Sequence, residues 1–150
     1  MSRASLRGSD VDEQAEPILS PARREGLVYG VGALHAAARG DRMMWALHRA
    51  ALSNGIVPVI PAVAVAEGYR TEARGDRIAE LLDGTEVEPF SSEAARRSGE
   101  LAARCDTTDL AVIAVVELAD RRNCAVVAQR QAVLRNAAAL LGHELVLYAV

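Results

Sequence analysis

The sequence contains no lysine, few aromatic residues and only two cysteines. All 17 basic side chains are arginine, and the net charge of −3 argues against binding nucleic acid through bulk electrostatic attraction. Aromatic residues make up 3% of the chain, so few rings are available to stack on single-stranded bases. Cys105 and Cys124 have no CxxC spacing, which excludes a zinc finger or a disulfide framework and favours reduced thiols.

Long hydrophobic runs are also missing. No apolar stretch approaches the roughly 20 residues that a membrane helix needs, and residues 1–25 lack the apolar segment of a secretory signal. We therefore expect a soluble, cytoplasmic protein. Residues 1–25 are polar, aperiodic and interrupted by Pro17 and Pro21, which predicts a flexible N-terminal arm. The 51% apolar composition predicts one packed domain over residues 26–150.

Within that domain, short apolar runs alternate with helical patterns. Strands are predicted over residues 27–29, 57–60, 86–89, 125–128 and 145–148. Helices are predicted over residues 33–39, 43–52, 61–69, 77–82, 91/92–104, 109–122 and 131–141. Strands separated by single helices or helix pairs form a parallel sheet that is covered on both faces. The predicted fold class is α/β, with its site beyond the carboxyl ends of the strands.

Gly30 and Gly32 follow the first predicted strand, as glycines do at the opening of a dinucleotide-binding fingerprint. The position of the third glycine is occupied by His35, and Pro61 ends the second strand where an acidic residue would hold a ribose. A tight turn from strand to helix explains this pattern at least as well. Nucleotide binding at the Gly30–Gly32 turn therefore ranks below the hypotheses that follow.

Four segments, in order and in register, resemble the motifs of the PIN-domain family of the bacterial VapC-like toxin type. They are Leu27–Leu34, Val59–Arg70, Thr107–Ala114 and Ala125–Arg130. The resemblance covers about residues 26–150 and implies a PIN-like three-layer sandwich with a five-stranded parallel sheet. It also implies an endoribonuclease fold in which acidic residues at the strand ends hold Mg²⁺ or Mn²⁺, and the metal generates a hydroxide nucleophile.

The sequence departs from the family pattern at three of the four acidic positions. Gly30, Val112 and Arg130 occupy these positions, and Glu67 alone remains at a matching place. Asp109 lies three residues before Val112 on the same helix face and adds a second carboxylate if it points inward. With −1 from Glu67, −1 from Asp109 and +1 from Arg130, the pocket charge would be about −1 instead of about −4, and such a pocket would hold a divalent cation poorly. The departures therefore imply that metal binding is lost, and we expect no metal or other cofactor.

Arg130 suggests what replaces the cation. We expect its guanidinium to stand in the metal's place and to pair with Glu67 or Asp109, because guanidinium groups bind carboxylates in bidentate geometry. Structural roles stay open for both acids. Asp109, with Asp106 as a capping residue, suits a helix N-terminus. Glu67 can form a surface pair with Arg70.

Other polar residues receive simpler interpretations. Arg70, Arg74 and Arg77 recur within two turns and form a candidate face for RNA or a partner, although a solvated helix surface explains such runs as well. The histidines are interpreted as surface or packing residues. Glu117 is interpreted as a solvated or dimer-facing residue rather than a ligand.

The leading hypothesis is a degenerate PIN-domain protein, a pseudoenzyme without nuclease activity, which binds RNA or a protein partner such as an antitoxin. The alternative is a weak or altered Mg²⁺- or Mn²⁺-dependent endoribonuclease of the toxin–antitoxin type that uses Glu67, Asp109 and Asp106. Members of the family commonly pair through helical faces. The resemblance therefore implies a homodimer, with the Ala-rich helices over residues 43–52 and 61–69 as the contact.

Overall fold

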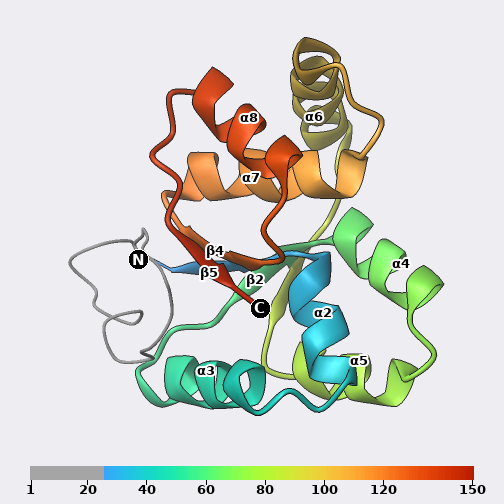
Figure 1. Ribbon diagram of the computed structural model, residues 1–150, viewed down its shortest axis with the longest axis vertical. Helices are drawn as coiled ribbons and strands as arrows, with labels where there is room; N and C mark the ends of the chain where they lie inside the picture. Colours follow the sequence, from blue (N-terminus) through green and yellow to red (C-terminus); the bar gives the residue numbers. More distant parts are fainter. Residues whose placement is uncertain (1–25) are drawn as a thin grey trace.

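The computed structural model describes residues 26–150, so the expected flexible arm over residues 1–25 lies outside the described residues. Five strands form one sheet in the order β3-β2-β1-β4-β5, and every neighbouring pair is parallel (Figure 1). The strands are β1 (Leu27–Tyr29), β2 (Val59–Pro61), β3 (Glu86–Glu88), β4 (Ala125–Ala128) and β5 (Leu147–Ala149). The predicted α/β fold with a five-stranded parallel sheet is confirmed.

Helices cover both faces of this sheet. They are α2 (Val31–Ala38), α3 (Arg42–Ser53), α4 (Ala62–Thr71), α5 (Gly75–Leu82), α6 (Ser92–Cys105), α7 (Leu110–Arg122) and α8 (Ala132–Leu140). Figure 1 shows α6, α7 and α8 above the sheet and α2, α3 and α5 below it. Helix α4 packs against α7 and α2 and so joins the two helical layers. None of the helices in residues 26–150 is long and apolar enough to cross a membrane.

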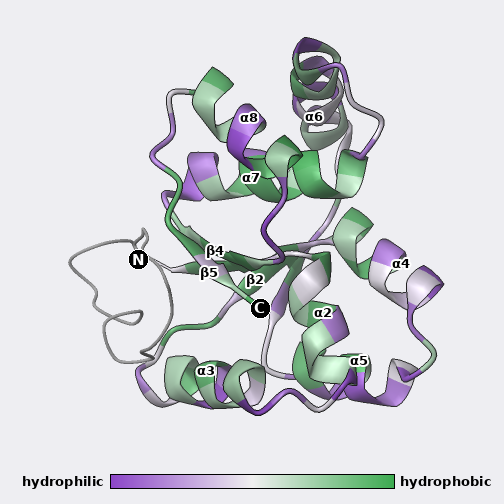
Figure 2. Cartoon of the chain, viewed as in Figure 1, coloured by the Kyte–Doolittle hydropathy of each residue, from purple (hydrophilic) through white to green (hydrophobic). Residues whose placement is uncertain are grey.

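Burial explains why the central elements form where they do. Strands β1 and β4 are buried along their whole length, as expected for strands covered by helices on both faces. In α7 every residue from Ala111 to Ala119 is buried, because this helix lies between the sheet and the outer helices α6 and α8. Figure 2 shows these same elements as the most hydrophobic parts of the chain.

The element boundaries differ from the predicted ones by one or two residues, for local reasons. Strand β2 begins at Val59 rather than at residue 57, because Val57 is exposed and Pro58 has no N–H for the sheet. Pro61 ends β2 and precedes α4 as its N-cap, so it is not the first helical residue. Helix α2 begins at Val31 because Gly30 itself is the N-cap, in an extended conformation.

Glu117 does not face solvent, so the solvated position considered for it from the sequence is wrong. Its side chain is 10% exposed and accepts hydrogen bonds from Arg97 on α6 (Nε, 2.8 Å) and from Arg121 on α7 (Nε, 3.0 Å). Arg121 also pairs with Glu88 of β3 at 2.6 Å, and Glu88 in turn binds Arg122 at 2.9 Å. Burial would raise the pKa of Glu88, but the two arginines hold it below its ordinary value. The network ties α6, α7 and the edge strand β3 together.

His48 is a packing residue inside the lower layer. The Tyr29 hydroxyl lies 2.8 Å from Nδ1 of His48, and the ring of Trp45 meets the imidazole edge-on. The His48 residue is 4% exposed. Burial lowers the pKa of His48, and the charge of Arg49 lowers it further. The folded protein therefore favours the neutral imidazole.

This burial predicts acid sensitivity. The unfolded chain protonates His48 near its ordinary pKa of about 6.5, and the folded chain does so only at lower pH. The stability that His48 contributes is therefore complete above pH 6.5 or so and is lost as the pH falls below it. We expect urea unfolding to show a steeper loss of stability below about pH 6.5 in wild type than in His48→Gln. Parallel pH profiles for the two proteins would contradict this assignment.

Candidate functional site

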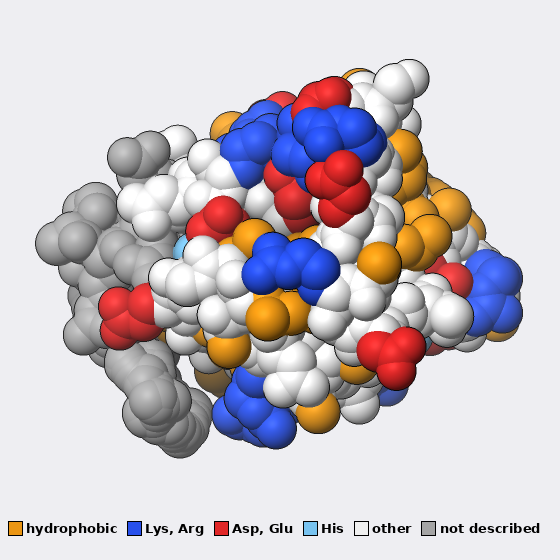
Figure 3. Space-filling view, turned by 90° about the horizontal axis from the view of Figure 1, so that it is seen from above, with side chains coloured by type: hydrophobic (Ala, Val, Ile, Leu, Met, Phe, Trp, Pro, Cys, Tyr) orange, Lys and Arg blue, Asp and Glu red, His pale blue; other side chains and the backbone are white. Residues whose placement is uncertain are grey.

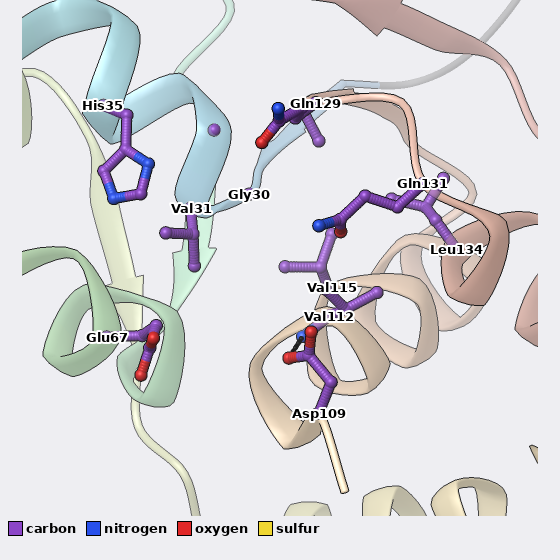
Figure 4. Close-up of a pocket in the computed structure, with 12 residues that line it drawn as sticks. Gly30, Val31, His35, Glu67, Asp109, Val112, Val115, Gln129, Gln131 and Leu134 are labelled. Carbon is purple, nitrogen blue, oxygen red and sulfur yellow. Dashed lines mark hydrogen bonds between the residues drawn. The ribbon is translucent and has the colours of Figure 1, made fainter. Parts of the chain in front are cut away.

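A pocket lies at the carboxyl ends of β1 and β4, where the strand order of the sheet reverses, as expected for a parallel α/β fold (Figure 4). Backbone at two glycines, aliphatic side chains and a few polar groups form its walls. The lining residues are Gly30, Val31, Gly32, His35, Glu67, Asp109, Val112, Val115, Ala128, Gln129, Gln131 and Leu134. Four of the predicted site positions, 30, 67, 109 and 112, thus come together in one pocket.

Gly30 and Gly32 let α2 begin directly against β4 and the segment after it. A Cβ atom on Gly30 would lie 2.9 Å from Cβ of Ala128, and one on Gly32 would lie 2.5 Å from the backbone nitrogen of Gln129. Both distances are shorter than real side chains allow. Packing therefore explains the two glycines, and position 30 has no room for an acidic side chain unless its neighbours shift.

Glu67 lies on α4 at the edge of the pocket and is engaged by its own helix. Arg70 donates to it through Nε at 3.0 Å and Nη2 at 2.6 Å, a bidentate pair. The hydrogen bond from Arg70 lowers the pKa of Glu67, so this carboxylate stays ionised. His35 contacts Thr71 at 2.7 Å between Nε2 and Oγ1, which links α2 to the end of α4. The surface pair considered for Glu67 is present.

Asp109 is the N-cap of α7. Its Oδ1 accepts the backbone N–H of Val112 at 3.2 Å, and its own N–H binds Oγ1 of Thr107 at 3.1 Å. Asp106 does not cap this helix; it ends α6 in a left-handed conformation with φ of 54°. Figure 4 shows Asp109 and Glu67 on opposite sides of the pocket. The two acids therefore do not converge on one point.

The expected pairing of Arg130 with Glu67 or Asp109 is wrong. Arg130 is exposed, is not among the pocket residues, and forms no ion pair with any residue of the 26–150 range. Its neighbours Gln129 and Gln131 line the pocket instead. The direction of a loop side chain depends on backbone torsions after β4, which the sequence pattern does not reveal.

The pocket residues do not fit a Mg²⁺ or Mn²⁺ ion. Such an ion takes about six oxygen ligands, mainly from carboxylates and water. The two carboxylates here lie apart, and each already binds a neighbouring donor. In the part of the chain that the structure describes, no group of three or more His, Cys, Asp or Glu side chains could hold a metal. The remaining polar groups include Gln129 and Gln131, for which the sequence predicts no chemical role.

The arginines expected to form one face have different surroundings. Arg70 is paired with Glu67, and Arg74 is paired with Asp76 at 3.0 Å. Arg77 instead lies beside Gly40, at the connection between α2 and α3. A shared binding face of the three remains a prediction.

Comparison with solved structures identifies the fold. No protein-family model matches the chain, and no curated protein matches it. The structure of VapBC2 from Rickettsia felis bound to a DNA fragment from their promoter matches with a TM-score of 0.63 and 14% identity, over 83% of this chain and 98% of that one. The structure of PAE2754 from Pyrobaculum aerophilum matches with a TM-score of 0.54 and 15% identity, over 73% and 84%. At these identities the likeness establishes the fold alone, and that fold is PIN-like as predicted.

Proposed function

We propose that this protein has no metal-dependent nuclease activity and acts by binding another protein. The observation that carries the proposal is that the pocket lacks a group of carboxylates able to share one metal ion. Of the residues that line it, only Glu67 and Asp109 are acidic, and these bind Arg70 and the N-terminus of α7 rather than a shared point. Metal-assisted hydrolysis needs carboxylates that gather on one ion, because the ion generates the nucleophile and stabilises the leaving oxygen.

A protein partner fits the surface better than RNA does. Many arginines already have carboxylate partners, which reduces the positive charge available to phosphates; these are Arg70, Arg74, Arg96, Arg97, Arg121 and Arg122. The surface also exposes large apolar side chains, including Met43 at 60% and Val57 at 59%. Because the fold is shared with VapBC2, an antitoxin-like protein is the first partner class to test, with a homodimer as the expected state of the chain.

Calorimetry with Mn²⁺ and an RNA-cleavage assay test this proposal. We expect no Mn²⁺ binding tighter than about 1 mM and no cleavage that depends on Glu67. The variants are Glu67→Ala and, as a matched control just beyond α4, Glu72→Ala. Stoichiometric Mn²⁺ uptake together with RNA cleavage that Glu67→Ala abolishes and Glu72→Ala retains would overturn it.

One observation favours the alternative of a weak Mg²⁺- or Mn²⁺-dependent ribonuclease. Glu67 and Asp109 line the same pocket, at the strand ends where the family resemblance places a metal. Asp106 is not among the residues lining this pocket. Under this alternative, Asp109→Ala would abolish cleavage and Asp106→Ala would not. The same assay, extended to these two variants, therefore decides between the alternatives.

A further inference from the structure

In residues 26–150, most clustered arginines are paired with carboxylates on the same or adjacent elements. On α6, Arg96 pairs with Glu93 and with Glu100, and Arg97 pairs with Glu117 of α7. Figure 3 shows basic and acidic side chains interleaved over the region of α6. These surfaces offer little net charge to a partner.

The connection between α2 and α3 differs. Gly40 turns the chain there with φ of +77°, and Arg39 and Arg42 lie on either side of it. Arg77 of α5 reaches the same place: its Nη1 would lie 2.9 Å from a Cβ atom on Gly40. Figure 1 shows the end of α2 beside α5. Arg39, the C-cap of α2, and Arg42, the first residue of α3, flank Gly40 in the chain, and the Arg77 guanidinium from α5 reaches the same glycine. We call these three residues, Arg39, Arg42 and Arg77, the arginine corner.

No carboxylate in residues 26–150 pairs with the arginine corner. Asp41 is the nearest acid in the sequence, and its Oδ1 accepts the backbone N–H of Met44 at 2.9 Å, as the N-cap of α3. Helix α5 carries Asp76, which pairs with Arg74, and Glu80, and Asp83 is its C-cap; none of these acids forms an ion pair with Arg77. Arg77 is half-buried, so part of its hydration is already removed without a compensating charge.

We propose that the arginine corner docks an acidic segment of a partner protein that also carries apolar side chains. Guanidinium groups bind carboxylates in bidentate geometry, and three of them select a segment with several acids. Met43 is 60% exposed immediately after Arg42 and supplies an apolar contact beside the charges. This inference rests on the proposed function, because it assigns the chemistry of the partner.

Single-stranded RNA fits the corner less well. Stacking on aromatic rings provides much of the affinity for unpaired bases. Trp45 on α3 is partly buried against the core, with its Nε1 donating to the backbone oxygen of Ala37. The exposed ring of Tyr69 lies beside Gly75 at the start of α5, so of these two residues Tyr69 alone offers an exposed ring. The net charge of −3 also opposes a long polyanion outside the corner.

A fluorescence anisotropy titration of the full chain tests the proposal. The probe is a short labelled peptide in which glutamates are interspersed with leucines, and its control has glutamine in place of glutamate. We expect the glutamate peptide to bind wild type, with weaker binding as salt rises from about 50 to 200 mM. Arg39→Gln, Arg42→Gln and Arg77→Gln together should weaken binding about tenfold. The same replacement at Arg96, Arg104 and Arg135, on the other side of the sheet, should change it less than about twofold.

Two outcomes of the titration would contradict the proposed docking of an acidic segment. Equal loss in the two triple variants, or no peptide binding by wild type, would overturn the inference. A single-stranded oligouridylate that bound more tightly than the peptide, and depended on the same three arginines, would identify phosphate as the occupant instead. Circular dichroism of both triple variants checks that they fold. Mn²⁺ uptake with Glu67-dependent cleavage would overturn the proposed function alone, whereas failure of the peptide in a metal-free protein would overturn only this inference.

Discussion

Gly32→Ala is expected to lower the free energy of unfolding by about 2 to 3 kcal/mol, although alanine is the better helix former. The added Cβ would lie 2.5 Å from the backbone nitrogen of Gln129 and 2.9 Å from its Cβ. A backbone atom cannot rotate away as a long side chain can, so α2 or the segment after β4 has to move. Helix α2 and the segment after β4 both line the pocket, so the substitution should displace pocket residues as well as destabilise the fold.

Urea unfolding, followed by circular dichroism, measures this effect as a lower midpoint at unchanged slope. Gly99→Ala on α6 is the matched control, because a Cβ atom there meets nothing within 4 Å. Removing a helical glycine at that open position should stabilise the protein by up to about 1 kcal/mol. Stabilisation by both substitutions would show that α2 does not pack against the β4–α8 connection as described.

Glu117→Ala should cost a similar amount, about 2 to 3 kcal/mol. The substitution leaves Arg97 and Arg121 without their shared carboxylate, and their side chains are only 31% and 34% exposed. This partial exposure keeps the cost below that of breaking a fully buried ion pair. For a chain of this size the loss corresponds to a decrease in Tm of about 6 °C, measurable by thermal unfolding.

Glu100→Ala is the control for this prediction. Glu100 also binds an arginine, Arg96 at 3.0 Å, but its side chain is 63% exposed and water replaces the contact. We expect a change of no more than about 0.5 kcal/mol. Similar losses from the two substitutions would mean that the buried position of Glu117 adds nothing to its ion pairs.

The sequence pattern predicts the central sheet well because its strands are continuous apolar runs. Strands β1 and β4 are predicted to the residue, since each is buried along its length; β1 lies between Gly26 and Gly30, and β4 is followed by the polar Gln129. Strands β2 and β5 are displaced by one or two residues from their predicted positions. Apolar residues that are exposed or partly exposed, such as Val57 and Leu145, precede these two strands, so the apolar run in the sequence begins before the strand does.

The candidate site is predictable in position but not in detail. Parallel strands place the residues after β1 and β2 at one edge, and the start of α7 lines the same pocket. Positions 30, 67, 109 and 112 are therefore brought together as expected. Which of Gln129, Arg130 and Gln131 turns inward depends on loop torsions. Glu67 binds Arg70 on its own helix, and Asp109 binds the N-terminus of α7. These local contacts compete with any role of the two carboxylates in the pocket.

The contact between Gly30 and Ala128 has a consequence for engineering and for the course of mutation. A single change of Gly30 to aspartate would force its Cβ to 2.9 Å from that of Ala128 before the new carboxylate reached the pocket. Converting the pocket into a metal centre therefore takes paired steps, with Ala128→Gly accompanying the new acid. The packing of Gly30 against Ala128 therefore opposes an acidic side chain at position 30 unless residue 128 changes with it.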